Sequence, residues 1–166
     1  MGTIKTLEKL FMEELYDLYS VEKQNITALT KMSKKANSDK LKTALEEHIS
    51  ESKGQKERLK KVFDVIGKKA RSKKCKGMEG IINEGEEMIG EADTDQLIMD
   101  AVIISAAQKV EHYEIAGYGT ITQLAKELGY DEAAELLAET LKEEKNADNK
   151  LTRLAKQSIN KKAKAD

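Results

Sequence analysis

The sequence predicts an all-α protein: an antiparallel bundle of four long helices in which a long connection joins the second helix to the third. The composition is that of a helical protein, because 36% of the residues are charged and the chain contains no proline. Apolar residues recur at helical spacing in four separate stretches, each longer than an average globular helix. The connections between these stretches are short, long and short in turn, which is typical of a bundle with one crossover.

The first two helices are expected to form an antiparallel pair. The first should cover residues 3–35 or 6–35, and the second residues 39–66. The segment ANSD at 36–39 interrupts the apolar pattern and supplies capping side chains for the second helix. Gly67 is expected to end that helix.

Residues 67–96 differ from the rest of the chain. A basic loop, KKARSKKCK, leads into a short amphipathic helix that is expected over residues 74–91 and is interrupted by glycines. Glycine weakens an isolated helix, so this fifth helix should lie against the bundle. Its length suits a crossover that carries the chain from one end of the bundle to the other.

The last two helices should form the second antiparallel pair. The third is expected to start near Thr94 and to end at Leu128, and the fourth should follow over residues 131–160, with Asp131 as its cap. The whole chain, residues 1–166, is expected to be a single domain that is large enough to bury a core.

Each long helix carries a glutamate near the middle of its apolar face. These residues are Glu22, Glu51, Glu111 and Glu144, and Glu114 lies one turn after Glu111 on the same face. An isolated buried carboxylate costs several kcal/mol, and four carboxylates around one point also repel each other. Two divalent cations would cancel four such charges, so the pattern predicts a centre that binds two metal ions. Oxygen ligands with one or two imidazoles favour iron or manganese, with zinc as a further possibility.

Three polar residues near these glutamates are further candidates. His48 lies three residues before Glu51 on the same face, where it is either a metal ligand or a hydrogen-bond partner of a ligand. Gln55 and Asp148 each lie four residues after a glutamate, which makes them ligands or groups that orient a ligand. The alternative is that the glutamates pair with lysines on the solvent-exposed sides of the helices, and the protein would then be a helical interaction module without a metal.

Three ring-bearing residues complete the set of candidates. His112 follows Glu111 but lies about 100° further around the helix, so it is a weaker candidate for contact with the centre. Tyr19 and Tyr118 are close to the glutamates in sequence. Each is either a relay for electrons or protons or, as is commoner, a core tyrosine that donates one hydrogen bond.

Charge and cysteine content limit the partners. The 29 basic residues nearly balance the 30 acidic ones, so neither nucleic acid nor an anionic membrane is expected as a partner. No apolar run approaches the roughly 20 residues of a membrane span, and the first residues lack the pattern of a secretory signal. The single cysteine, Cys75, suits a reducing compartment, so a cytoplasmic location is expected.

Several segments resemble one bacterial family over essentially the whole chain. They are LYSVEKQ in the first helix, HISE with QKER in the second, CKGMEG at the crossover, AAQKVEHYEIAGYGT in the third helix and ETLKEEKNADNKLT in the fourth. These segments are similar to the YciE/YciF family of ferritin-like proteins. The resemblance implies a ferritin-like fold, a cytoplasmic, stress-associated role, a dimetal centre and a homodimer.

The sequence departs from the wider ferritin and rubrerythrin superfamily in one respect. That superfamily carries Glu-x-x-His on the second and fourth helices, and the resemblance places Glu51 and Glu144 at the two glutamate positions. The two histidine positions are then Gly54 and Ala147. Both imidazoles are therefore missing, unless His48 replaces one and Asp148 the other.

Two functions are consistent with this pattern. The first is a stress-associated protein whose carboxylate-bridged iron or manganese reacts with peroxide or oxygen. The second is a metal-binding or structural stress protein without turnover, which the missing histidines favour. Whether the protein is an enzyme stays open at this point.

Overall fold

A computed structural model describes residues 3–92 and 95–164, and over these residues the chain is helical, with no strand. The elements are α1 (Leu7–Lys35), α2 (Asp39–Val65), α3 (Lys76–Glu91), α4 (Gln96–Glu127), α5 (Asp131–Leu154), a π-helical segment η1 (Ala155–Ile159) and α6 (Asn160–Ala163). No helix in the described part of the chain is both long and apolar enough to cross a membrane.

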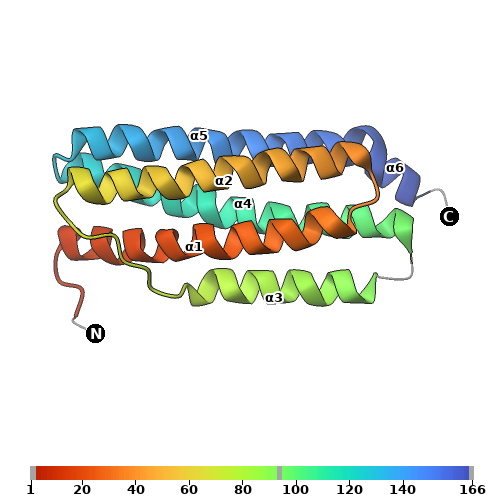
Figure 1. Cartoon of the computed structure of the whole chain (residues 1–166), viewed down its shortest axis with the longest axis horizontal. Coiled ribbons are helices and arrows are strands. Elements are labelled where there is room, and N and C mark those ends of the chain that lie inside the picture. The colour runs from red at the N-terminus through yellow and green to blue at the C-terminus, as the bar shows by residue number, and fades with distance from the viewer. Residues whose placement is uncertain (1–2, 93–94, 165–166) are drawn as a thin grey trace.

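Four of the helices form the predicted bundle (Figure 1). α1 packs against α2 and α4, and α5 packs against the same two helices, so each long helix has two long neighbours. α3 lies along the outside of the bundle against α4 and α1, and it carries the chain from the end where α2 stops to the end where α4 begins. The expected all-α bundle with a crossover that contains a fifth helix is therefore confirmed.

The expected ends of the first three helices are close to the observed ones. α1 begins after Thr6, whose hydroxyl accepts a hydrogen bond from the Lys9 amide at 3.1 Å, so the alternative start at Thr3 is wrong. Gly67 follows α2 with a φ of 67°, a left-handed conformation that glycine adopts without strain. α3, the crossover helix, begins two residues later than expected. The expected start of the third long helix, which is α4, is Thr94, and it lies outside the described residues.

The fourth helix differs most from its expected form, because it changes type before residue 160. α5 gives way at Ala155 to the π-helical segment, and α6 follows it. Leu151, Ala155 and Ile159 are all buried and are spaced by four residues. The wider turn of a π-helix keeps side chains at this spacing on one face more closely than an α-helix does.

The hydrophobic core is divided into two apolar clusters, one toward each end of the bundle. One cluster includes Phe11, Leu15, Leu59, Phe63, Ile121 and Leu137. The other includes Leu29, Leu41, Leu45, Ile103, Ile104 and Leu151. On every long helix, buried polar residues lie between residues of the two clusters in sequence, so a polar layer crosses the bundle near its middle. The members of this layer are Glu22 and Asn25, His48, Ser52 and Gln55, Glu111 and Glu114, and Glu144.

α3 approaches α4 closely because both helices carry small residues where they meet. A Cβ atom added to Gly85 of α3 would lie 3.0 Å from the Cβ of Ala106. This contact explains one of the glycines that weaken α3 as an isolated helix, because the same residue lets it pack on the bundle. The expectation that the crossover helix lies against the bundle is confirmed.

Asp100 of α4 fixes the turn between α1 and α2, a role that the sequence pattern does not reveal. Its carboxylate accepts hydrogen bonds from the amides of Asn37, at 2.7 Å, and Ser38, at 2.9 Å. Hydrogen bonds to a charged acceptor are each worth about 1.5–3 kcal/mol. We expect Asp100→Ala to lower the free energy of unfolding by about 2–3 kcal/mol, measured by urea denaturation.

A matched control is Asp95→Ala, which removes the exposed cap of the same helix. The Asp95 side chain accepts from the Leu97 amide at 2.8 Å, and loss of such a cap costs about 1 kcal/mol. Equal losses in the two variants would contradict a tie between α4 and the α1–α2 turn.

Candidate metal centre

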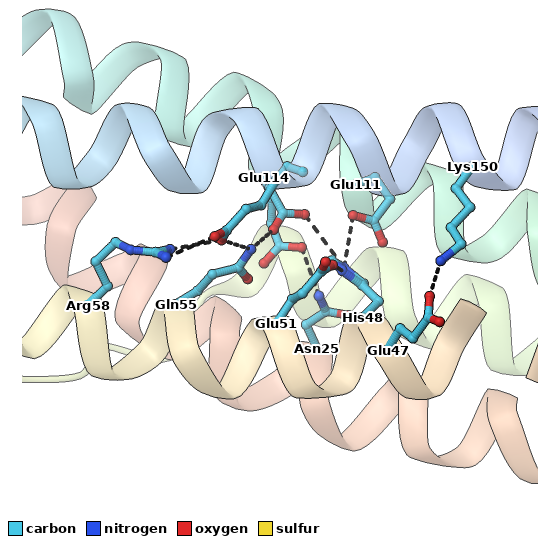
Figure 2. A network of polar contacts seen from close by, with 11 residues as sticks. Asn25, Glu47, His48, Glu51, Gln55, Arg58, Glu111, Glu114 and Lys150 are labelled. Carbon is cyan, nitrogen blue, oxygen red and sulfur yellow. Dashed lines mark hydrogen bonds and ion pairs between the residues drawn. The ribbon is translucent and has the colours of Figure 1, made fainter. Parts of the chain in front are cut away.

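Four glutamates and one histidine meet in the polar layer. Glu22 comes from α1, Glu111 and Glu114 from α4, and Glu144 from α5, and all four are fully buried. His48 of α2 is 4% exposed. Ligand atoms of His48, Glu111, Glu114 and Glu144 lie within 4.8 Å of one another, which is close enough for a shared ion (Figure 2).

Three neutral side chains each support one of these carboxylates. Asn25 donates a hydrogen bond to Glu114 Oε2 at 2.8 Å. Gln55 donates to Glu144 Oε1, and the Tyr118 hydroxyl donates to Glu22 Oε1. Each of these carboxylates therefore has one oxygen held by the protein, which fixes the direction of the other oxygen.

The remaining oxygens have no partner within the chain. Buried side-chain atoms that lack a hydrogen bond occur at one oxygen each of Glu22, Glu114 and Glu144, at both oxygens of Glu111, and at single atoms of Asn25, His48, Ser52 and Gln55. Buried polar atoms without partners are rare in native proteins, and each needs an explanation. Carboxylate oxygens with one imidazole nitrogen are the donors that iron and manganese bind, so the residues present suit a divalent cation.

The imidazole of His48 has different neighbours on its two sides. Nε2 lies 3.1 Å from Glu111 Oε2 and 3.6 Å from Glu144 Oε2, which are charge contacts, and it forms no hydrogen bond. Nδ1 lies 3.3 Å from Glu51 Oε2. A partner on Nδ1 orients the ring and leaves Nε2 facing the buried carboxylates, as is usual for a histidine that binds a metal.

Burial of so many acidic groups shifts their pKa values upward. Loss of hydration raises the pKa of Glu22 to about 8, and it raises the pKa of Glu114 and Glu144 well above the usual value. Repulsion among the carboxylates acts in the same direction. Burial alone would lower the pKa of His48, but attraction to Glu111 and the other acids outweighs it and raises that pKa. Without a cation, the layer must therefore bind protons at neutral pH.

The expectation that Glu51 lies among the buried carboxylates is wrong. Its side chain is 48% exposed, on the Nδ1 side of His48. The buried face of α2 passes from His48 to Ser52 and then Gln55, so it takes a step of four residues where a step of three was expected. Burying a serine in that turn costs far less than burying a carboxylate.

Because the buried face of α2 is shifted by one residue, the position of the missing histidine on α2, Gly54, does not face the polar layer. Gly54 is exposed, and a Cβ added there would meet nothing within 4 Å, so the position faces away from the layer. Ser52 and Gln55 are the two residues of α2 that face the layer with the three-residue spacing of the superfamily's Glu-x-x-His. On α5, by contrast, Glu144 and Ala147 are both buried as expected.

Three other candidates lie outside the cluster. Asp148 accepts a hydrogen bond from Gln108 at 2.9 Å and lies 3.3 Å from His112, whose side chain is 68% exposed. Tyr19 is buried but contacts the edge of Phe63 within the apolar cluster. The structure does not bring Asp148, His112 or Tyr19 to the buried glutamates, whereas it does bring Tyr118 and Gln55 there.

An ion pair between α2 and α5 supports Gln55 from outside the cluster (Figure 2). The two terminal nitrogens of Arg58 each lie 2.8 Å from a different oxygen of Glu143. Glu143 also accepts from Gln55 at 3.1 Å, and Gln55 donates to Glu144. This connected series extends from the surface to a buried carboxylate, and it holds the amide of Gln55 in one orientation.

Comparison with known proteins gives the family. The model of the family described as "Domain of unknown function (DUF892)" matches residues 6–164. Protein YciF of Escherichia coli strain K12 is 47% identical over 161 residues, which is 96% of each chain. The crystal structure of the E. coli stress protein YciF has a TM-score of 0.89 at 46% identity and covers 95% of this chain and 99% of that one.

Two further solved structures have the same fold. YcfI from Rhodopseudomonas palustris has a TM-score of 0.87 at 42% identity and covers 90% of this chain and 94% of that one. A protein from Xanthomonas campestris pv. campestris has a TM-score of 0.73 at 18% identity, with 94% of each chain covered, and at that identity it supports the fold alone. With a family match over almost its whole length and close similarity to YciF, the chain belongs to the DUF892 family.

Proposed function

We propose that the chain binds two divalent metal ions, iron or manganese, among Glu22, His48, Glu111, Glu114 and Glu144. The observation that carries this proposal is the set of buried carboxylate oxygens without partners, contributed by three different helices and joined by the His48 imidazole from the fourth. Four carboxylates carry a charge of −4, which two divalent ions would neutralise without protons. Zinc has the same charge and would also suit these donors.

The chemistry of such a centre would come from the metal and its control from the chain. When bound, iron or manganese would supply electron exchange with peroxide or oxygen. The chain orients the carboxylates through Asn25, Gln55 and Tyr118. The two apolar clusters border the layer on both sides along the bundle, and a less polar surrounding strengthens the interaction between an ion and a carboxylate. We propose a stress-associated protein with this activity, in line with the stress protein YciF.

A second function is a metal-binding or structural stress protein without turnover. It is favoured by Ala147, which occupies a histidine position of the superfamily and cannot bind a metal. The family resemblance also supports a homodimer and a cytoplasmic location. Because the long helices pack into one bundle, we also propose a single domain over residues 1–166.

The test is to load purified protein with iron or manganese and to measure bound metal and peroxide consumption. Two ions per chain and consumption faster than that of the free metal would support the first function. Two ions with no gain in rate would support the second. A chain that retains neither metal, nor zinc, would contradict both.

A conservative variant tests the support of the centre. We expect Tyr118→Phe to weaken metal affinity about 10-fold, because loss of a partner that orients a ligand has effects of this size. The control is Tyr113→Phe on the same helix, where the hydroxyl lies 3.0 Å from Cys75 Sγ and donates to Asp17 at 3.2 Å. Competition titration with a chelator measures both affinities, and equal affinities would contradict a role for the Tyr118 hydroxyl.

A further inference from the structure

A cavity of about 420 Å³ lies between α2 and α5 and reaches the buried cluster. Its inner wall includes His48 and Glu111, and its outer wall includes Glu47, Lys150 and Arg153. Both carboxylate oxygens of Glu111 are buried and accept no hydrogen bond, and Oε1 has no charge partner either, so an acceptor is available on this side of the cluster. The cavity therefore connects the surface of the protein with the proposed metal centre.

The cavity exists because both helices carry alanine where they face each other. Ala44 of α2 and Ala147 of α5 line it. Ala147 is one turn beyond Glu144, where a histidine would fill the space and bind the metal. In this chain the small side chain leaves the space open, so the missing histidine gives the centre a side opening.

Three carboxylates lie along the cavity at decreasing exposure. The side chain of Glu47 is 53% exposed, that of Glu51 is 48% exposed, and that of Glu111 is fully buried. Glu51 contacts Nδ1 of His48, whereas the buried carboxylates lie on the Nε2 side. A cation held by Glu51 would therefore be one imidazole away from the cluster.

The outer opening is covered by an ion pair between the two helices. Lys150 of α5 pairs with Glu47 of α2, beside His48 and Glu111 (Figure 2). Exposed ion pairs of this kind are weak, so this one can separate readily in solution. Separation would free the Glu47 carboxylate and widen the opening beside Glu51, which is already half-exposed.

We propose that this cavity is the route by which a divalent cation reaches the buried cluster, with Glu51 as a transient binding site on that route. The inference rests on the proposed function, because it assumes a centre to be filled. It assigns Glu51 a role in the rate of metal uptake and removes it from the ligands of the filled centre.

Stopped-flow mixing of metal-free protein with Co(II), followed by its visible absorption, tests the route. We expect Glu51→Gln, which keeps the size of the side chain, to slow association and dissociation alike by about 10-fold or more. The dissociation constant should then stay within about twofold, because the new amide oxygen can still accept a hydrogen bond from His48 Nδ1 and the ion uses the same route in both directions. Lys150→Ala should speed both steps, since it uncovers the opening. The control, Glu57→Gln, changes an exposed residue of the same helix outside the cavity and should change neither.

Three outcomes would overturn the inference. A larger dissociation constant for Glu51→Gln with an unchanged association rate would make Glu51 a ligand of the filled centre. Unchanged rates for both Glu51→Gln and Ala147→Leu, which fills the cavity, would place the route elsewhere. Slower uptake in Ala147→Leu alone would remove Glu51 from the route. If the unaltered protein binds no Co(II), the proposed function fails as well, which separates that case from the other three.

Discussion

Glu111→Gln is expected to lower metal affinity by about two orders of magnitude or more while it stabilises the metal-free protein. Both carboxylate oxygens of Glu111 are buried and accept no hydrogen bond, and Oε2 lies 3.1 Å from His48 Nε2. Glutamine has the same size, but it carries no charge and can donate to a neighbouring carboxylate. In the metal-free protein the change removes one of four mutually repelling carboxylates, and we expect this relief to exceed the lost attraction to His48, for a net gain of about 1 kcal/mol.

Two measurements on one variant separate this expectation from a general loss of structure. Titration with Mn(II) should show the loss of affinity, and urea denaturation in the presence of chelator should show the gain in stability. Glu57→Gln, on the surface of α2, should change neither quantity. A variant that is both less stable and unable to bind metal would indicate a structural role for Glu111, and unchanged affinity would remove it from the ligands.

The metal-free protein is expected to lose stability as the pH rises from about 4.5 to about 8. Burial raises the pKa of Glu22 from 4.5 to about 8 in the folded state. A raised folded-state pKa gives a contribution that is complete below pH 4.5 and is lost as the pH rises through 8. Glu114 and Glu144 act in the same direction, and so does His48, whose pKa is also raised. The total loss should be on the order of several kcal/mol.

Bound metal should remove or reverse this trend. Ions compete with protons for the same oxygens, so the stability that metal adds grows with pH. Urea denaturation at several pH values between 5 and 8, with chelator and with saturating Mn(II), measures both curves. Glu13, which forms ion pairs with Lys9 and Lys73 on the surface, does not interfere with this measurement. Hydrogen bonds from the two lysines lower its pKa to about 2, so its contribution changes only below pH 4.5. A flat curve with chelator would contradict the protonated layer.

Helical periodicity was sufficient to predict the bundle and most of its polar layer. On α4 and α5 the apolar stripe is regular, so Glu111, Glu114 and Glu144 could be placed on the buried face from spacing alone. Glu22 on α1 followed in the same way. These positions required only that the helices be straight and that one face of each be covered.

The face of α2 could not be predicted to within one residue, because its central turns are almost entirely polar. From His48 to Arg58 the buried positions are a histidine, a serine and a glutamine, and none of them signals burial by its chemistry. The glutamate at 51 resembled a ligand more strongly than the serine beside it. Small size did not distinguish Ser52 either, because Ser50 and Gly54 in the same run are also small and both are exposed.

Asn25 and Asp100 were missed for a different reason. Each acts on a segment far away in sequence, since Asn25 donates to Glu114, 89 residues later, and Asp100 accepts from Asn37, 63 residues earlier. No pattern within one helix contains this information. Asn25 lies three residues after Glu22, about one helical turn, so an amide on the same face as that carboxylate was a usable clue.

The division of the core into two apolar clusters also determines how the four helices align along their length. A helix that slid by one turn, about 5.4 Å, would carry its acidic side chain into an apolar cluster and bring an aliphatic residue into the polar layer. The buried acids therefore disfavour every arrangement in which the helices are shifted along one another, although they destabilise the metal-free fold. A chain with leucine at all of these positions would melt at a higher temperature, yet it could settle in several staggered forms.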